Sequence, residues 1–397
     1  SMKRIFISLI LLAFLLGGCT SEKNNNTSFD YPNDATYVKS VWITYYELQE
    51  LMNNSEKVFR KNINGAFSSL SKMGFNTVTV QVRPCADAFY KSKYFPSSVY
   101  CFGKQGSELP FDPLEIMCEI ADKDELKIEA WVNPYRVSQD SDINKLSDDN
   151  IAKKWYKSDK KKNNVLVVND KLYFNPASDE VTELIVNGVK ELVKNYNIDA
   201  VHFDDYFYPD KSKNIDKKEY NEYKKAGGKL QLYDWRRENV NKMLEKVYSS
   251  IKKINPETKF GISPAANINN DYHDLYADVN KWCTVDGYLD YICPQVYYGF
   301  KNETMPFMQT TKKWAKMSQK PLYIGLPLYK SGIKDKYASE DNKKAINEFC
   351  DNDNTISRQI TYISKIKEIS GFYIFSYGSL KDKKCKKEVE NLMNVLK

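Results

Sequence analysis

The chain has 397 residues, of which 42% are hydrophobic and 14% aromatic. This composition excludes a disordered chain and is ample for one large core, so a single barrel-type domain can take up the whole length. The formal net charge of +7 is modest, and lysines are interspersed with acidic residues, which is typical of a solvated surface. We expect no nucleic-acid partner, and attraction to anionic polymers of a cell envelope is an alternative use of the excess charge.

The N-terminal segment has the pattern of a secretion signal. Lys3 and Arg4 precede the short apolar run IFISLILLAFLLGG, and the residues 16–19, LGGC, resemble the lipobox of a bacterial lipoprotein. The resemblance implies that residues 1–18 are a signal peptide and that lipid is attached to the thiol of Cys19, since the apolar run is short for a membrane anchor. Residues 19–36 are polar and unpatterned, which predicts a flexible tether. We therefore expect a protein that is anchored to the membrane outside the cytoplasm.

Eight short apolar segments follow, separated by amphipathic patterns. The predicted strands are Val38–Tyr46, Thr77–Val82, Lys127–Val132, Ala200–Phe203, Lys259–Ile262, Tyr288–Cys293, Leu322–Gly325 and Gly371–Phe375. Helical spacing is clear over 58–74, 178–197 and 235–256. Alternating strands and helices predict a parallel sheet, and eight units predict a closed (β/α)₈ barrel over residues 37–397. An open doubly wound sheet is the alternative, which the lack of a GxGxxG motif after any strand disfavours.

Cysteine and histidine usage argues against a metal site. Seven cysteines remain after Cys19, none forms a CxxC pair, and the chain has two histidines, His202 and His273. A zinc site is therefore not expected, nor any cofactor, and most cysteines are predicted to be small buried side chains. A disulfide between Cys85 and Cys101 is an alternative that nothing in the sequence requires.

Polar and aromatic residues gather at the predicted C-terminal ends of the strands, where barrels of this kind place their active sites. The candidates for substrate contact there are Glu47, Arg83, Asp87, Asn133, Tyr135, Arg136, His202, Gln295, Tyr297 and Tyr377. No glycine-rich phosphate loop accompanies them, and tyrosine offers an apolar face with a polar tip. This edge of the barrel is therefore predicted to suit a neutral, hydroxyl-rich ligand.

Two adjacent carboxylates follow the fourth strand, in the stretch VHFDDYFYP. Side chains alternate along a strand, so that with Val201 packed beneath the helices, His202 and Asp204 should point into the barrel. Asp205 joins them if the strand twists or bulges at its end. Neighbouring carboxylates push their pKa values apart, which suits general acid/base catalysis. The alternative is a structural ion pair of Asp204 with Arg136 or Arg83.

A family resemblance rests on several motifs taken together. In order along the chain these are QVRPCADAFY, AWVNPYR, NP at 175–176, VHFDDYFYP, DWRRENV, GISP, DYICPQVYY and IGLPLYKSG. From about Tyr37 to Gly378 the chain resembles the glycosyl-hydrolase-like 10 family of bacterial envelope proteins. The resemblance implies a (β/α)₈ barrel and, for characterised members, cleavage of peptidoglycan glycan strands.

The adjacent acids also resemble those of more distant barrel hexosaminidases. That resemblance implies that Asp204 orients the 2-acetamido group of the substrate, which acts as the nucleophile, and that Asp205 is the general acid/base. Ordinary retaining enzymes instead use a carboxylate nucleophile about 5–5.5 Å from the acid, and Glu47 or Asp87 would fill that role.

The supporting residues have roles that the sequence leaves open. Gln295 and Tyr297 are candidates for hydrogen bonds to the acetamido group or to ring hydroxyls. His202 either orients Asp204 or is a satisfied core histidine. Asn133 and Arg136 are candidates for binding a hydroxyl or the lactyl carboxylate of muramic acid. Arg236 is predicted to pair with Asp234 or a neighbour on its helix, and the lysine-rich stretches 155–166 and 209–231 to be solvated loops.

Three functional hypotheses follow. The first is a lipid-anchored glycoside hydrolase that cleaves β-1,4 bonds of peptidoglycan glycan strands. The second is a catalytically inactive glycan-binding lipoprotein on the same fold. A solute-capturing lipoprotein of a transporter is a weaker third reading, since such binders usually have two lobes.

Overall fold

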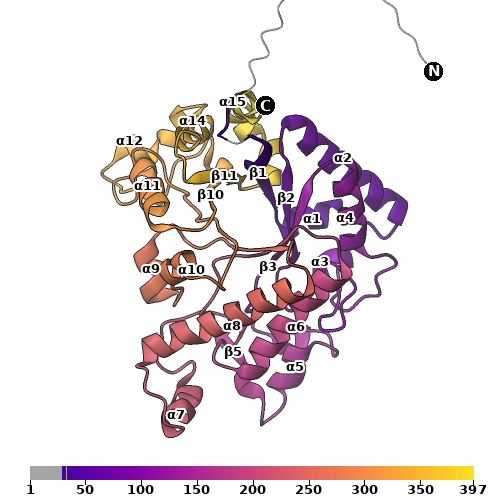
Figure 1. Cartoon of the computed structure of the whole chain (residues 1–397). Helices are drawn as coiled ribbons and strands as arrows, with labels where there is room; N and C mark the ends of the chain where they lie inside the picture. Colours follow the sequence, from indigo (N-terminus) through magenta and orange to yellow (C-terminus); the bar gives the residue numbers. More distant parts are fainter. Residues whose placement is uncertain (1–28, 33) are drawn as a thin grey trace, which may run out of the picture.

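The structure is a computed structural model that describes residues 29–32 and 34–397. Within these residues, eight parallel strands form a closed barrel, as the sequence predicted (Figure 1). Their order around the barrel is β1 (Val38–Ile43), β11 (Ile369–Ile374), β10 (Leu322–Leu326), β9 (Tyr291–Ile292), β8 (Lys259–Ile262), β7 (Ala200–Phe203), β3 (Lys127–Val132) and β2 (Thr77–Arg83). The fold is a (β/α)₈ barrel.

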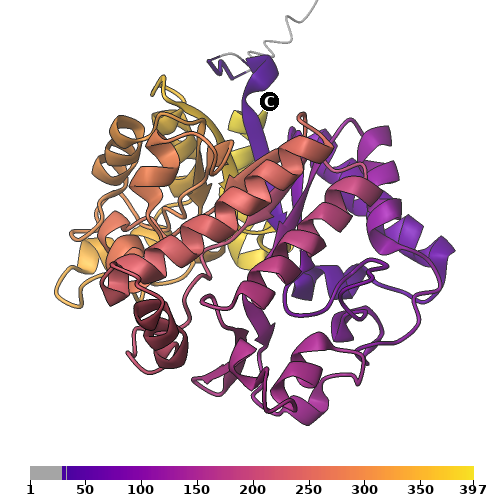
Figure 2. The ribbon, with the colours of Figure 1, turned by 60° about the horizontal axis from the view of Figure 1, so that its bottom comes forward.

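Helices on the outside connect successive strands. The connecting helices are α2 (Glu56–Met73), α4 (Pro113–Lys123), α6 (Asp179–Asn195), α8 (Leu232–Ile254), α10 (Val279–Thr284), α11 (Phe307–Met317) and α14 (Thr355–Ile363), and α15 (Lys386–Leu396) follows β11. Shorter helices lie in the loops: α1 (Tyr45–Leu51), α3 (Val99–Phe102), α5 (Ile151–Tyr156), α7 (Lys217–Lys225), α9 (Ile268–Asp274), α12 (Lys343–Ile346) and α13 (Glu348–Asp351). Figure 2 shows α6 and α8 side by side on the outer surface. Among the described residues, no helix is both long and apolar enough to cross a membrane.

The two lysine-rich stretches are more ordered than the sequence predicted. The segment after β3 folds into a small antiparallel sheet, in the order β4 (Arg136–Ser138), β6 (Lys171–Phe174) and β5 (Val165–Val168). The segment after β7 carries α7 and is fixed by a buried ion pair, because Arg236 Nη2 lies 2.6 Å from Asp216 Oδ1 and both side chains are inaccessible. The predicted pairing of Arg236 with Asp234 is wrong, since Asp234 pairs with Arg237. Arg236 pairs with Asp216 of the loop because both side chains are buried, and a buried charge left without a partner would be strongly destabilising.

The first strand is shorter than predicted. It ends at Ile43, and the hydroxyl of Thr44 caps α1 by accepting from the backbone N–H of Glu47. The Glu47 carboxylate in turn accepts the backbone N–H of Thr44 at 2.9 Å, which completes a capping box. The apolar pattern through Tyr46 therefore belongs partly to the first turn of a helix.

Alternation along the strands separates two cores, as expected. Val201 and Phe203 pack outward against the helices, while His202 points into the barrel. The interior holds large aromatic side chains, among them Trp42, Trp131, Tyr291 and Tyr373. Gly261 makes this possible, because a Cβ atom there would lie 1.9 Å from the Tyr291 ring. The aromatic layer forms the floor beneath the C-terminal end of the barrel.

The seven cysteines of the described residues are all free, and six of them are buried. Cys85 and Cys101 are both reduced, so the alternative of a disulfide between them is not realised. The sulfur atoms act as small apolar groups, as the sequence indicated.

Candidate active site

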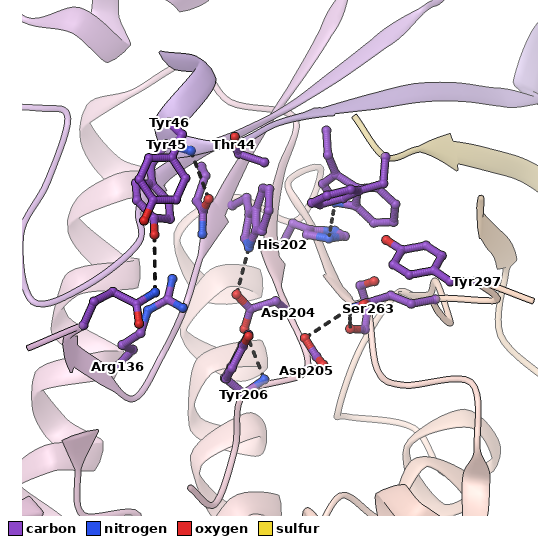
Figure 3. Close-up of a pocket in the computed structure, with 16 residues that line it drawn as sticks. Thr44, Tyr45, Tyr46, Arg136, His202, Asp204, Asp205, Tyr206, Ser263 and Tyr297 are labelled. Atoms are coloured by element: carbon purple, nitrogen blue, oxygen red, sulfur yellow. Dashed lines mark hydrogen bonds between the residues drawn. The ribbon is translucent and has the colours of Figure 1, made fainter. Parts of the chain in front are cut away.

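A pocket of about 320 Å³ opens at the C-terminal end of the barrel (Figure 3). It is lined by Trp42, Thr44, Tyr45, Tyr46, Gln81, Trp131, Arg136, Gln139, His202, Asp204, Asp205, Tyr206, Ser263, Gln295, Tyr297 and Phe375. Among the lining residues, Asp204 and Asp205 are the carboxylates. The adjacent acids predicted from the sequence thus share one pocket.

Asp204 is held firmly at the end of β7. Its side chain is 4% exposed, and Oδ2 accepts the indole N–H of Trp131 at 3.0 Å. Oδ1 accepts the backbone N–H of Tyr206 at 3.3 Å, which bends the chain just after the strand. Donors on both oxygens favour the charged form of this carboxyl.

Asp205 lies beyond the strand end, is half-buried and faces the other side of the pocket. Its Oδ1 accepts the side-chain amide of Gln295 at 3.2 Å, and the same amide nitrogen donates to the backbone oxygen of Ser263 at 3.0 Å. Asp205 therefore reaches the pocket because the regular strand stops at Phe203.

The two carboxyls resist ionisation. Burial is the main cause that raises the pKa of Asp204 to about 7, and repulsion from Asp205 adds to it. Burial also raises the pKa of Asp205, opposed by the hydrogen bond from Gln295. Since the two groups repel each other, they titrate as a pair, and the charge left by the first proton makes the second harder to lose.

Arg136 and a group of tyrosines form the wall of the pocket that lies across the acids from Ser263 and Tyr297. Figure 3 shows Arg136, Tyr45 and Tyr46 on one side of the acids, and Ser263 and Tyr297 on the other. The Arg136 Nε donates to the backbone oxygen of Pro84 at 2.9 Å, and the guanidinium carbon lies 5.1 Å from the centre of the Tyr206 ring. In the part of the chain that the structure describes, neither Arg136 nor Arg83 lies within ion-pair distance of Asp204, although the charge of Arg136 acts to lower the pKa of Asp204. The structural ion pair weighed for Asp204 is absent there.

His202 belongs to the floor of the pocket. Its Nε2 accepts the indole N–H of Trp42 at 3.1 Å, and its Nδ1 lies 2.8 Å from the hydroxyl of Tyr291. Burial lowers the pKa of His202 to about 3, so the ring is neutral. A neutral ring with these partners does not bond to Asp204 and instead fixes the aromatic layer beneath it.

Six of the predicted contact residues do not line the pocket. These are Glu47, Arg83, Asp87, Asn133, Tyr135 and Tyr377. Asn133 Oδ1 caps the backbone N–H of Arg136 at 3.0 Å, and Asp87 accepts the amide of Gln105 at 3.0 Å while being 1% exposed. Besides its capping box, Glu47 accepts the hydroxyl of Ser376 at 3.0 Å and the backbone N–H of Gly378. The side-chain oxygens of Asn133, Asp87 and Glu47 thus hold the surrounding loops in place.

Two of these six residues, Arg83 and Tyr135, remain inside the fold. Arg83 is buried with its guanidinium carbon 4.5 Å from the centre of the Phe95 ring, and Tyr135 is fully buried. Tyr377 lies on a short turn, 7% exposed, with Lys381 over its ring. Of the predicted contact residues, Arg136, His202, Gln295 and Tyr297 line the pocket beside the acids.

Several lining residues were not singled out from the sequence, among them Tyr206, Gln81 and Gln139. Tyr206 directly follows the acids and is 45% exposed. Its position beside two catalytic candidates could have indicated from the sequence that it lines the site. The side-chain oxygen of Gln81 accepts the backbone N–H of Tyr45 at 3.1 Å, and the side-chain amide of Gln139 donates to the hydroxyl of Tyr45 at 3.3 Å. Trp131 belongs both to the aromatic interior of the barrel and to the lining of the pocket. In the described residues, no three His, Cys, Asp or Glu side chains gather in a way that would bind a metal ion.

Solved structures with a similar fold are glycoside hydrolases of low sequence identity. The glycoside hydrolase domain of PgaB (BpsB) from Bordetella bronchiseptica superposes with a TM-score of 0.56 at 9% identity, over 91% of this chain and 99% of that one. The catalytic domain of β-amylase from Paenibacillus polymyxa gives 0.57 at 10% identity, over 91% and 97%. At such identities the likeness concerns the fold.

Sequence relatives are more informative. The glycosyl hydrolase YngK of Bacillus subtilis is 35% identical over 356 residues, which are 83% of this chain and 66% of that protein. The glycosyl hydrolase DigH of Escherichia coli (strain K12) is 34% identical over 288 residues, 66% of this chain and 64% of that protein. The chain thus spans just under two thirds of these relatives' length. Residues 37–342, which include both acids and most of the barrel, match the family described as glycosyl hydrolase-like 10, and the chain belongs to that family.

Proposed function

We propose that this glycoside hydrolase cleaves β-1,4 bonds of peptidoglycan glycan strands, with the 2-acetamido group of the substrate as nucleophile. One observation supports this mechanism above the others. The pocket presents two adjacent carboxylates, while Glu47 and Asp87, the rival nucleophiles, are engaged outside it. Adjacent residues have Cα atoms about 3.8 Å apart, which is awkward for attack and protonation at opposite ends of one bond.

The proposed steps use each carboxyl once. Asp204 acts in its charged form, held by Trp131, and accepts the acetamido N–H so that the carbonyl oxygen is directed onto the anomeric carbon. Asp205 donates the proton of the pair to the leaving oxygen as the glycosidic bond breaks. It then takes a proton from water, which attacks the anomeric carbon, opens the cyclic intermediate and restores the acetamido group.

The other walls suit the substrate. Arg136 carries a positive charge beside Tyr45 and Tyr206, where it would pair with the lactyl carboxylate of a muramic acid unit. Trp42, Phe375 and Tyr297 supply aromatic faces for sugar rings. Gln295 lies beside Asp205, where it would contact the acetamido group or a hydroxyl.

The test of this proposal is a digest of purified glycan strands free of stem peptides, with the products weighed by mass spectrometry. Cleavage products in whole-sugar steps are expected, and their reducing ends identify the bond that is cut. The alternative function, an inactive glycan-binding protein, predicts retention of the strands on the protein without any new reducing ends.

The pH dependence of this activity should follow the acid pair. We expect kcat/KM to fall towards alkaline pH, because the pair, in which both pKa values are raised, then loses the proton that the leaving oxygen needs. In the Asp204→Asn variant a negative neighbour is removed, which lowers the pKa of Asp205 and moves this alkaline limb to lower pH. Initial rates on glycan strands across the pH range check both statements. An alkaline limb that does not move in Asp204→Asn would contradict the coupling of the two carboxyls.

We further propose that the protein works outside the cytoplasmic membrane, anchored through lipid on Cys19. Cys19 lies outside the described residues, so this proposal is supported by the sequence pattern of residues 3–19. A Cys19→Ala variant should move from the membrane pellet to the soluble fraction, because one thiol carries the whole anchor. Cys350→Ala, which alters a half-buried cysteine of the barrel domain, is the matched control and should stay in the pellet. A Cys19→Ala protein that pellets like the wild type would refute the lipobox interpretation.

A further inference from the structure

A second cavity adjoins the catalytic pocket at the same end of the barrel. Its volume is about 450 Å³. It is lined by Ala265, Ala266, Asn267, Gln295, Tyr297, Tyr298, Asn302, Thr304, Met305, Tyr329, Lys330 and Tyr337. Gln295 and Tyr297 also line the catalytic pocket, so the two cavities share a wall.

The shared wall is fixed in place. The backbone of Gln295 bridges to Ala265 on one side and to Gly325 on the other, so it continues the barrel sheet beyond β9. Its side chain bonds Asp205 at 3.2 Å. A chain-like ligand that passes over Gln295 therefore leaves the acids and enters the second cavity directly.

The second cavity is polar and aromatic but has no unpaired charge among its described lining residues. Lys330, its one ionisable amine, donates to Asp335 Oδ1 at 3.1 Å and to the backbone oxygen of Tyr297 at 2.6 Å, and is 3% exposed. Tyr337 stands at the opening with 68% of its surface exposed. An exposed ring beside amide and hydroxyl groups is suited to stacking on a sugar. The neutralised Lys330 offers nothing to a carboxylate, and Lys336, whose ammonium lies 5.3 Å from the centre of the Tyr337 ring, does not line the cavity.

We propose that this second cavity is an accessory subsite for an uncharged N-acetylglucosamine-type unit of the same glycan strand, stacked on Tyr337. The contrast with the catalytic pocket is chemical, because the Arg136 cation there forms no ion pair with any described residue, whereas Lys330 here is neutralised by Asp335. The inference rests on the proposed function, since it takes the ligand to be a glycan that continues past the acids. It makes the protein a binder of extended strands rather than of a single sugar.

Binding to a catalytically silenced protein tests the subsite. In the Asp205→Asn background, titration calorimetry with a long N-acetylglucosamine oligomer should show affinity about 10-fold weaker after Tyr337→Ala, the scale of one lost stacking contact. The weakening should be the same at low and high salt, because the oligomer is uncharged. Thr304→Trp, which obstructs the cavity from its exposed side, should weaken binding similarly.

Tyr156→Ala is the matched control, because Tyr156 is 40% exposed and lies on α5, outside both cavities. Affinity in Tyr337→Ala and Thr304→Trp equal to that in Tyr156→Ala would overturn the subsite. A Tyr337 contribution that falls with salt would overturn its neutral character. Failure of the proposed function is separate, since it would appear as intact glycan strands after incubation with the protein that retains Asp205.

Discussion

Asp204→Asn and Asp205→Asn should each reduce turnover of glycan strands by at least about 10²-fold, the scale of a lost general acid or charge stabiliser. Asparagine keeps the shape of the side chain, so Trp131 and Gln295 still have an oxygen to bond. What is lost is the proton donor at position 205 and the negative charge at position 204. Initial rates from reducing-end release, at saturating strand concentration, measure the effect.

Folding should survive both substitutions. The pKa of Asp204 is raised from 3.8 to about 7, so the folded state holds its proton more tightly than the unfolded state does. The contribution of Asp204 to the free energy of unfolding is therefore present at low pH and is lost as the pH rises from 3.8 to about 7. The Asp204→Asn variant does not titrate and so does not undergo this loss. We expect a melting temperature of Asp204→Asn at pH 8 that is not below that of the wild type.

Asp210→Asn is the matched control for the pair. Asp210 lies on the same loop, outside the pocket, and accepts the neighbouring N–H of Lys211. It should retain full activity. Wild-type turnover in both Asp204→Asn and Asp205→Asn would contradict a catalytic role and would mean that the two carboxyls are structural.

Chemically deacetylated glycan strands should resist cleavage by at least about 10²-fold, and re-acetylation should restore it. A free amine cannot supply the carbonyl oxygen that attacks the anomeric carbon, so the nucleophile is removed from the substrate and not from the protein. Rates on matched strands before deacetylation, after it and after re-acetylation measure the effect.

The rival mechanism gives a different result. A carboxylate nucleophile, such as Glu47 or Asp87, tolerates a free amine and forms a covalent sugar ester. Trapping followed by mass spectrometry of the peptides that contain residues 47, 87, 204 and 205 distinguishes the two. Rapid cleavage of deacetylated strands, or a sugar on any carboxylate, contradicts substrate assistance and leaves the fold and the pocket unchanged.

The barrel itself could be predicted from local patterns. Apolar segments alternate with amphipathic ones throughout, and burying both kinds at once leaves few arrangements other than a parallel sheet wrapped by helices. The position of the acids followed from the same pattern, because a charged pair directly after a short apolar strand must lie at its C-terminal end. The phase of His202 followed from alternation. These features depend on neighbours in the sequence.

The ends of the elements could not be read so directly. The stretch through Tyr46 is as apolar as a strand, yet the hydroxyl of Thr44 caps a helix there, with Glu47 as its partner. A candidate nucleophile thus became part of a helix cap. Likewise, Arg236 pairs with Asp216 because the loop after β7 folds back onto α8. The spacing of residues along α8 does not indicate this pairing.

The sequence by itself determined the (β/α)₈ fold, the family and the location of Asp204 and Asp205 at one end of the barrel. Only the tertiary structure decided which side chains share the pocket with them. Trp131 reaches Asp204 from β3, Gln295 reaches Asp205 from the end of β9, and Arg83 stays inside. The reason is physical: every strand end carries polar residues, and contacts between elements far apart in the chain, which local spacing does not reveal, decide which of them face the pocket.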